Sequence, residues 1–261
     1  MPFLFLEPFA GGGICGLTVA FERLAGHVIM GEMDEYVSAV WKTILDGQAE
    51  WLALRILTFE LTLDNVKKAL SEDTKSNLIL REQAFLTILR NRVQRGGIMA
   101  PGAGLVKSGE DNRGISSRWY AKTLARRIRE IAANRHMLTF VQGDGMALIH
   151  EHRNDPQAMF FADPPYTKAA RRLYRHWKFD HHQLFVDLST CKGDFLISYD
   201  DTDEIRALTE EFNLQWRVVS MKSTHHAKKK ELLIGRDFTW LDAAVGPQEA
   251  WHAVPLRNLL D

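Results

Sequence analysis

Short apolar runs separated by turn residues make up the first part of the chain. Phe3–Leu6 has the pattern of a buried strand, and a glycine turn links it to Gly16–Ala25, where apolar residues recur at helical spacing. A second apolar strand covers His27–Met30, and a second helix covers about Tyr36–Leu45. This β-α-β-α order predicts the start of a parallel, doubly wound sheet.

The alternation stops after residue 45. Residues 46–90 have helical periodicity, residues 91–120 are irregular and rich in Gly, Ser and Arg, and Tyr120–Asn134 has the pattern of an amphipathic basic helix. The predicted domains are a core formed by 1–45 and 135–240, an inserted helical and irregular domain at 46–134, and a tail at 241–261.

Strand patterns resume after the insertion, at Met137–Val141, Met159–Ala162, Asp194–Ser198, Trp216–Met221 and Glu231–Ile234. The stretch 199–215 is helical, whereas no clear helix separates the last two strands. These two strands predict an antiparallel hairpin at the sheet edge. The predicted fold is therefore α/β: a Rossmann-like, mostly parallel sheet with an antiparallel edge hairpin and one inserted domain.

Composition adds one feature to this outline. The chain has 261 residues, 46% of them apolar and 25% charged, with a net charge of +0, which is ordinary for a globular protein. Residues 81–136 nevertheless contain twelve Lys or Arg and four acidic residues, a net charge of +8. Such a segment favours contact with a polyanion, and a solvated helical face is the alternative.

The two cysteines, Cys15 and Cys191, are far apart and lack metal-ligand spacing, which indicates a reducing compartment. His181-His182 and His225-His226 have no carboxylate or cysteine at ligand spacing, so no metal is expected. No run approaches the roughly 20 apolar residues that cross a bilayer. We therefore expect a protein with no membrane contact.

A glycine-rich turn, Glu7-Pro-Phe-Ala-Gly-Gly-Gly13, follows the first strand and precedes a helix. Glycines there let the backbone turn sharply and let a ligand approach the peptide planes. Glu32 ends the second strand, where a carboxylate can accept hydrogen bonds from ribose hydroxyls. The pair favours a nucleoside cofactor over a plain βα connection.

A second motif, Asp163-Pro-Pro-Tyr166, ends the buried strand that contains Phe160. Pro164 and Pro165 lack N–H donors and restrict the residue before them, so a carboxylate and a carbonyl can point rigidly outward beside an aromatic ring. Such acceptors can take both protons of an exocyclic amino group while its base stacks on Tyr166. The nitrogen lone pair is then free to attack a methyl sulfonium.

These motifs, in this order and with a long insertion between them, resemble the Dam-like (D12-class) DNA adenine N6-methyltransferases. Weaker similarities are Val28–Glu32, Asn91-Arg92, Phe140–Asp144, Leu196–Ser198 and Lys230–Ile234. The resemblance implies transfer of a methyl group from S-adenosylmethionine to adenine N6 in double-stranded DNA. It also implies a Rossmann-like methyltransferase sheet, base flipping and no covalent enzyme intermediate. It places the protein in the cytoplasm, associated with the nucleoid.

The resemblance also implies the residues of the site. Asp163, Pro164 and Tyr166 would be catalytic. The cofactor would contact Glu7, Phe9, Gly11, Gly13, Glu32, Asp144 and Asp163. We expect DNA contacts from Arg92, Arg95, Arg118, Arg126, Arg127, Lys168, Arg171 and Arg172, with a solvated surface as the alternative.

Two alternative functions stay open at this point. The same acceptor cluster serves any planar amino group, so RNA adenine or cytosine N4 could replace adenine in DNA. In the family, a glycine–lysine segment usually precedes the first strand and covers the methionine end of the cofactor, whereas six residues precede Glu7 here. The chain could therefore be a DNA-binding subunit of a larger assembly, in which a second protein completes the cofactor site.

Overall fold

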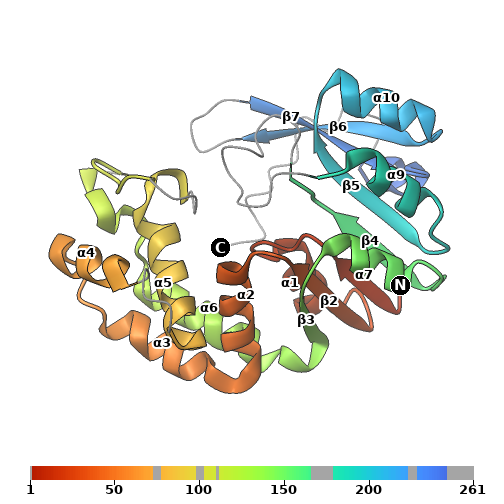
Figure 1. The fold of residues 1–261 in the computed structure, drawn as a ribbon. Helices are drawn as coiled ribbons and strands as arrows, with labels where there is room; N and C mark the ends of the chain where they lie inside the picture. The colour runs from red at the N-terminus through yellow and green to blue at the C-terminus, as the bar shows by residue number, and fades with distance from the viewer. Residues whose placement is uncertain are drawn as a thin grey trace.

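The computed structural model describes residues 2–72, 78–97, 103–109, 112–165, 179–222 and 228–245. These residues form one seven-stranded sheet in the order β3-β2-β1-β4-β5-β7-β6 (Figure 1). The strands are β1 (Leu4–Glu7), β2 (His27–Glu32), β3 (Leu138–Gln142), β4 (Ala158–Ala162), β5 (Asp194–Asp200), β6 (Gln215–Lys222) and β7 (Lys228–Gly235). Strands β3, β2, β1, β4 and β5 are parallel, and β7 is antiparallel to β5 and β6. The predicted sheet and its edge hairpin are confirmed.

The first strand lies at the centre of the sheet and is buried along its whole length. Leu4 and Leu6 pack into the apolar cluster on one face, whereas Phe5 packs into the cluster on the other face. A central parallel strand needs apolar side chains on both faces, which explains its continuous apolar run. Glu7 ends this strand and is also buried, with 3% of its surface exposed.

Helices cover both faces of the sheet (Figure 1). Helices α1 (Ile14–Phe21) and α2 (Glu35–Thr43) pack on one face. Helices α7 (Gly145–His152), α9 (His181–Ser189) and α10 (Asp203–Glu211) pack on the other. A last helix, α11 (Thr239–Val245), follows β7. Because β3, β2, β1, β4 and β5 are parallel, their carboxyl ends lie at one edge of the sheet, where ligands bind in such folds.

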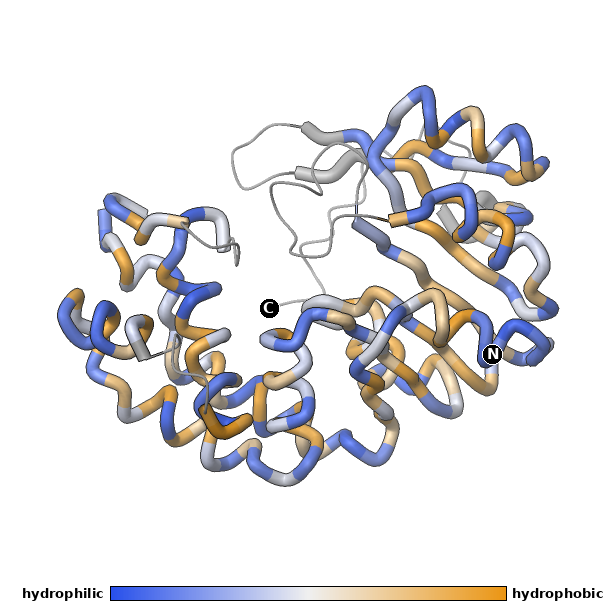
Figure 2. The backbone as a smooth tube through the Cα atoms, in the orientation of Figure 1, coloured by the Kyte–Doolittle hydropathy of each residue, from blue (hydrophilic) through white to orange (hydrophobic). Residues whose placement is uncertain are grey.

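The helices between α2 and β3 have an apolar core of their own. They are α3 (Ala49–Thr58), α4 (Leu63–Glu72), α5 (Leu80–Val93) and α6 (Ala121–Ala133), with short helical turns at Arg95–Gly97, Gly114–Arg118 and Arg135–Met137. Leu52 and Phe85 are fully buried in this core, which also includes Ala39 and Ile44 from the α2 side. Trp41 of α2 packs instead against the sheet. Helix α2 therefore joins the two cores, and Figures 1 and 2 show it between the sheet and the other helices.

A π-helical turn, Ile44–Gln48, connects α2 to α3. Asp46 and Gly47 leave helical geometry there, and Gly47 has a φ of 89°. Glycine adopts this conformation without the steric cost that a Cβ would add. The turn directs the chain away from the sheet and into the insertion.

Several predicted boundaries are wrong. The first helix begins at Ile14 and ends at Phe21, because the glycine turn continues directly into it. Strand β5 extends to Asp200, so the helix after it is shorter than the predicted stretch 199–215. Helices α7 and α9 were not predicted at all.

Candidate active site

The glycine turn after β1 is held in place by α2 and β2. The Ala10 amide donates to the Gly31 carbonyl at 2.8 Å, and the Trp41 indole N–H donates to the Gly11 carbonyl at 2.9 Å. Gly11 and Gly13 have φ angles of 49° and 64°. A Cβ on Gly13 would lie 2.7 Å from the Trp41 ring. Gly13 is therefore required both by backbone conformation and by the close approach of Trp41.

Glu32 connects this turn to the start of α2. One carboxylate oxygen accepts from the Gly11 amide at 3.0 Å, and the other accepts from the Asp34 amide at 2.8 Å. Burial raises the pKa of Glu32 above its ordinary value, and these hydrogen bonds oppose that shift. The Met33 amide also interacts with this carboxylate, which keeps acceptor capacity for a ligand hydroxyl. The carboxylate lies at the strand end where the sequence predicted it.

Asp144 lies beyond the next strand, β3, on the same edge of the sheet. It caps α7 by accepting from the Met146 amide at 3.0 Å, and its side chain is exposed. The adjacent Gly145 packs tightly, since a Cβ there would lie 2.5 Å from the Pro8 carbonyl and from the Phe9 ring. The beginning of α7 is thereby fixed against the glycine turn.

Asp163 follows β4, the strand on the other side of β1. Its side chain is exposed, whereas Pro164 is buried. Tyr166, the third predicted catalytic residue, lies outside the described residues. Burial is the main cause of the raised pKa of Glu7, Cys15 and Tyr199, and the charge of Asp163 adds to each shift, which places all three side chains within its electrostatic reach.

Glu7 lies deeper than Asp163. Its carboxylate accepts from the Gly16 amide at 2.7 Å, and a Cβ on Gly16 would lie 2.6 Å from the same oxygen. Burial, and then the charge of Asp163, raise the pKa of Glu7 to about 7, against hydrogen bonds from the Gly16 and Cys15 amides. Burial likewise raises the pKa of the Cys15 thiol to about 12. Cys15 is therefore a protonated neighbour of Glu7 and not a nucleophile.

A row of aromatic side chains extends from the glycine turn to β5. The rings of Phe9 and Phe179 meet edge to face at 5.3 Å between centroids, and Phe179 contacts His181 at the same centroid distance. The His181 Nδ1 atom lies 2.7 Å from the Tyr199 hydroxyl. Burial lowers the pKa of His181 below its ordinary value, which favours the neutral ring. The row was not foreseen, because its contact between Phe9 and Phe179 joins segments far apart in the sequence.

The sequence model of one family, the D12 class N6 adenine-specific DNA methyltransferases, matches residues 3–222. This match covers most of the chain, including the glycine turn, the insertion and Asp163. The chain belongs to this family. A search of individually curated proteins finds no match. Membership makes the protein an adenine-specific DNA methyltransferase, and it identifies duplex DNA as the substrate.

The predicted DNA-binding residues of this methyltransferase have different surroundings. Arg92 of α5 lies close to Arg118, at the end of the helical turn Gly114–Arg118, and to Arg127 of α6. Burial, and then the charges of Arg118 and Arg127, lower the pKa of Arg92 from its ordinary value. Arg126, in contrast, forms an exposed ion pair with Glu130 at 2.9 Å. The exposed Arg95 lies in the helical turn after α5. Lys168, Arg171 and Arg172 lie outside the described residues.

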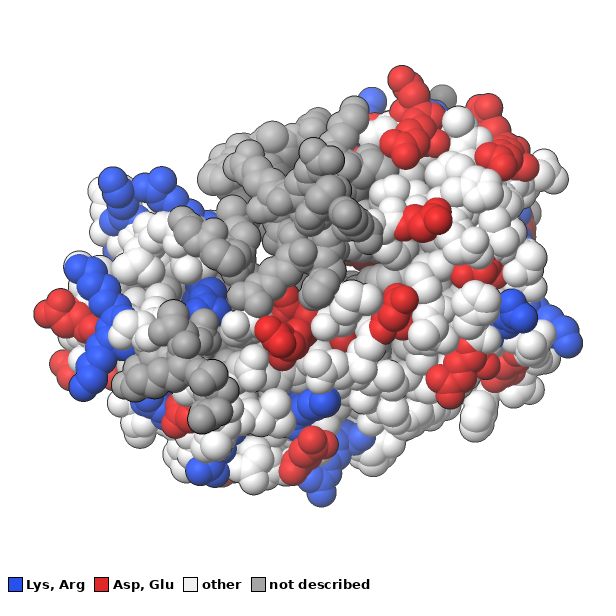
Figure 3. All heavy atoms as spheres, in the orientation of Figure 1, with Lys and Arg blue, Asp and Glu red and all other residues white. Residues whose placement is uncertain are grey.

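The charged side chains of the methyltransferase are distributed unevenly. Figure 3 shows many Lys and Arg side chains over the inserted helices, whereas acidic side chains predominate over α9 and α10 on the face in view.

Within the described part of the chain, no helix is long and apolar enough to cross a membrane.

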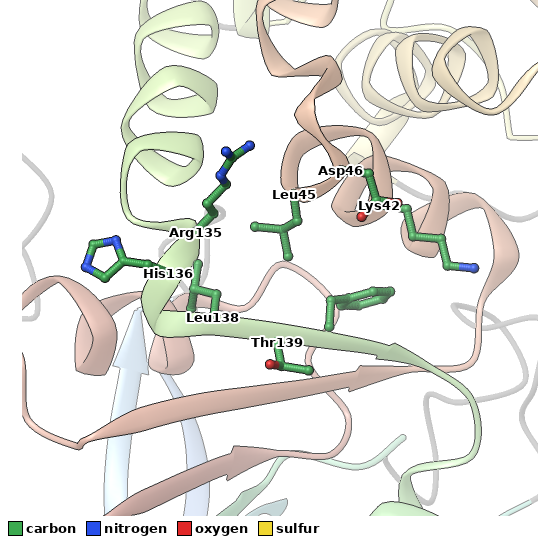
Figure 4. A pocket seen from close by; sticks show the side chains of 8 residues that line it. Lys42, Leu45, Asp46, Arg135, His136, Leu138 and Thr139 are labelled. Atoms are coloured by element: carbon green, nitrogen blue, oxygen red, sulfur yellow. The ribbon is translucent and has the colours of Figure 1, made fainter.

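A hollow of about 490 Å³ lies at the β3 edge, where the insertion joins the sheet (Figure 4). Its lining residues are Lys42, Leu45, Asp46, Arg135, His136, Leu138, Thr139 and Phe140. Strand β3 is three strands from β4, which corresponds to roughly 14 Å at the usual strand spacing. The hollow is therefore separate from the carboxylates at the ends of β1 and β4.

Proposed function

We propose that the chain transfers the methyl group of S-adenosylmethionine directly to N6 of an adenine flipped out of duplex DNA. The observation that carries the proposal is the position of Asp163 beside the glycine turn, at the ends of the neighbouring strands β4 and β1. A methyl donor bound at the turn would lie next to an amino group held by Asp163. Direct transfer needs only this juxtaposition and no covalent intermediate.

The described residues fit the proposed cofactor. Gly11 and Gly13 let it approach the backbone, and the Glu32 carboxylate keeps acceptor capacity for ribose hydroxyls. Asp144 is exposed on the same edge and can accept from the adenine amino group of the cofactor. Phe9 supplies an apolar surface beside them. When bound, S-adenosylmethionine supplies an electrophilic methyl group.

Asp163 would accept one N6 proton of the target adenine, and the backbone carbonyl of Pro164 would accept the other. Holding both protons favours a tetrahedral nitrogen whose lone pair points at the methyl group. Tyr166 would stack on the flipped base. Unstacking an adenine costs a few kcal/mol, which contacts in this pocket and to the phosphates must offset.

The three clustered arginines are the proposed phosphate contacts of the insertion. Arg92, Arg118 and Arg127 come from three segments and repel one another, so an anion between them would relieve that repulsion. Arg95, Lys168, Arg171 and Arg172 stay proposed DNA contacts. Arg126 is proposed as the weakest contributor, because Glu130 already neutralises it.

Replacement of Asp163 tests the proposed mechanism. Asp163→Ala should lower methyl transfer to duplex DNA by about a hundredfold to a thousandfold, because it removes an acceptor that acts on the reacting nitrogen. Affinity for duplex DNA, measured by fluorescence anisotropy, should stay within about twofold of the unmodified protein. Transfer within tenfold of the unmodified protein would contradict the role given to Asp163.

A further inference from the structure

Glu7 and Asp163 lie on the same side of the sheet. Strands β1 and β4 are parallel neighbours with Leu6 opposite Phe160. Side chains alternate along a strand, and Phe5 and Phe161 both contact the cluster under α1. The same alternation directs Glu7 toward α1, and the electrostatic effect of Asp163 on Glu7 and Cys15 agrees with this placement. Two carboxyl groups, from the ends of neighbouring strands, therefore face the same side of the sheet within electrostatic reach of each other, at the point of proposed methyl transfer.

Glu7 has unusual surroundings for a carboxyl group. It is 3% exposed, it accepts hydrogen bonds from backbone amides of α1, and no ion pair joins it to a lysine or arginine of the described segments. Within the described segments, the titratable groups near it are Cys15 from α1 and Asp163 after β4, with Tyr199 of β5 within electrostatic reach of Asp163. No cation among them balances its charge. Its pKa of about 7 makes Glu7 ready to accept or release a proton near neutral pH.

We propose that Glu7, through Asp163, takes up the proton that methyl transfer releases from adenine N6. This inference rests on the proposed function and gives a chemical role to a carboxyl group that the transfer step itself does not use. Asp163 contacts the amino group, whereas Glu7 lies behind it and stores the proton.

The step balances in atoms and charge. The N6 lone pair forms a bond to the methyl carbon while the bond from that carbon to sulfur breaks, and its electron pair stays on sulfur. The sulfonium becomes a neutral thioether and N6 becomes a cation. N6 then loses one proton to the Asp163 carboxylate, which passes it to Glu7. A positive sulfonium and an ionised Glu7 are thereby replaced by two neutral groups, so the buried site gains no net charge.

The coupling between the sulfonium charge and Glu7 should also affect cofactor binding in the absence of methyl transfer. A cationic cofactor favours the ionised form of Glu7, so its binding should release protons near pH 7. The thioether product, S-adenosylhomocysteine, lacks the sulfonium charge and should release fewer. The difference between the two ligands measures the coupling of Glu7 to the sulfonium and needs no catalysis.

Isothermal titration calorimetry at pH 7 in two buffers of different ionisation enthalpy measures this proton release. We expect S-adenosylmethionine to release up to about half a proton per site, because a group with a pKa near 7 is half protonated there, and S-adenosylhomocysteine to release clearly less. Glu7→Gln should abolish the difference. Glu7→Asp, which restores a carboxylate, and Glu22→Gln at the exposed end of α1 should keep it.

A second measurement needs no variant. In protein with ¹³C-labelled glutamate side chains, one carboxyl should titrate near pH 7, and S-adenosylmethionine should move its titration to lower pH more than S-adenosylhomocysteine does.

In the calorimetry, equal proton release by the two ligands, or a difference that persists in Glu7→Gln, would overturn the role of Glu7 alone. Failure of both ligands to bind would overturn the proposed function together with it.

Discussion

Single residues of the site hold the local backbone in place and are also the proposed ligand contacts. The Glu32 carboxylate accepts from two amides, and Gly13 leaves space for Trp41. The sequence predicted Glu32 and Gly13 as site residues, because strand ends and glycine turns have recognisable patterns. It could not predict the contact of Trp41 with Gly11, since this contact depends on how α2 packs against the sheet.

Glu7 should make the stability of the folded protein depend on pH. Its pKa rises from 4.5 to about 7 on folding, so the folded state binds the proton more tightly than the unfolded state. This contribution is fully present below pH 4.5 and is lost as the pH rises through 7. The full difference corresponds to about 3 kcal/mol.

Urea unfolding of the unmodified protein and of Glu7→Gln at pH 5 and pH 8 checks this expectation. The free energy of unfolding of the unmodified protein should fall more between these pH values than that of Glu7→Gln, by roughly 2 to 3 kcal/mol. Equal falls in both proteins would mean that Glu7 is ionised in the folded state throughout this range.

At the scale of elements, the glycine turn is held by hydrogen bonds to β2 and α2. The strands and the main helices were predictable from apolar periodicity. Helices α7 and α9 were missed although Asp144 and Asp180 are good helix caps, and the structure shows both side chains accepting from the first-turn amides. Both helices are short, and their apolar residues pack on a sheet whose position the sequence does not reveal.

Two adjacent glycines of the turn should respond differently to substitution. Gly13→Ala places a methyl group against Trp41 in a positive-φ conformation, so it should lower the free energy of unfolding by roughly 2 kcal/mol and weaken S-adenosylmethionine binding at least about tenfold. Gly12→Ala is the control, since a Cβ there meets nothing within 4 Å. Chemical denaturation and calorimetry measure both effects, and a similar response of the two variants would contradict this account of the turn.

At the scale of the whole molecule, a net charge of +0 conceals the basic insertion. The sequence revealed the excess of arginine there, but it could not separate arginines that are already paired from those that are clustered. The ion pair of Arg126 with Glu130 and the proximity of Arg92 to Arg118 and Arg127 appear only in the fold. The sequence therefore shows which segment is basic, and the structure shows which of its arginines are paired and which are clustered.

This selection predicts unequal effects on DNA binding. Arg92→Ala, Arg118→Ala and Arg127→Ala should each weaken duplex binding and reduce the slope of log affinity against log salt by about 1, because each would remove one of the proposed phosphate contacts. Arg126→Ala should change neither quantity appreciably. Fluorescence anisotropy over a range of salt concentrations measures both, and an Arg126→Ala effect as large as the others would contradict the assignment.

The most direct test of the central claim is methyl transfer itself. The purified chain is incubated with S-adenosylmethionine carrying a radiolabelled methyl group and duplex DNA of mixed sequence, and the DNA is then digested to nucleosides and separated. We predict that the label appears as N6-methyladenine and that Asp163→Ala abolishes it. Label in N4-methylcytosine, or equal label with Asp163→Ala, would contradict the assignment of Asp163 as the acceptor at adenine N6.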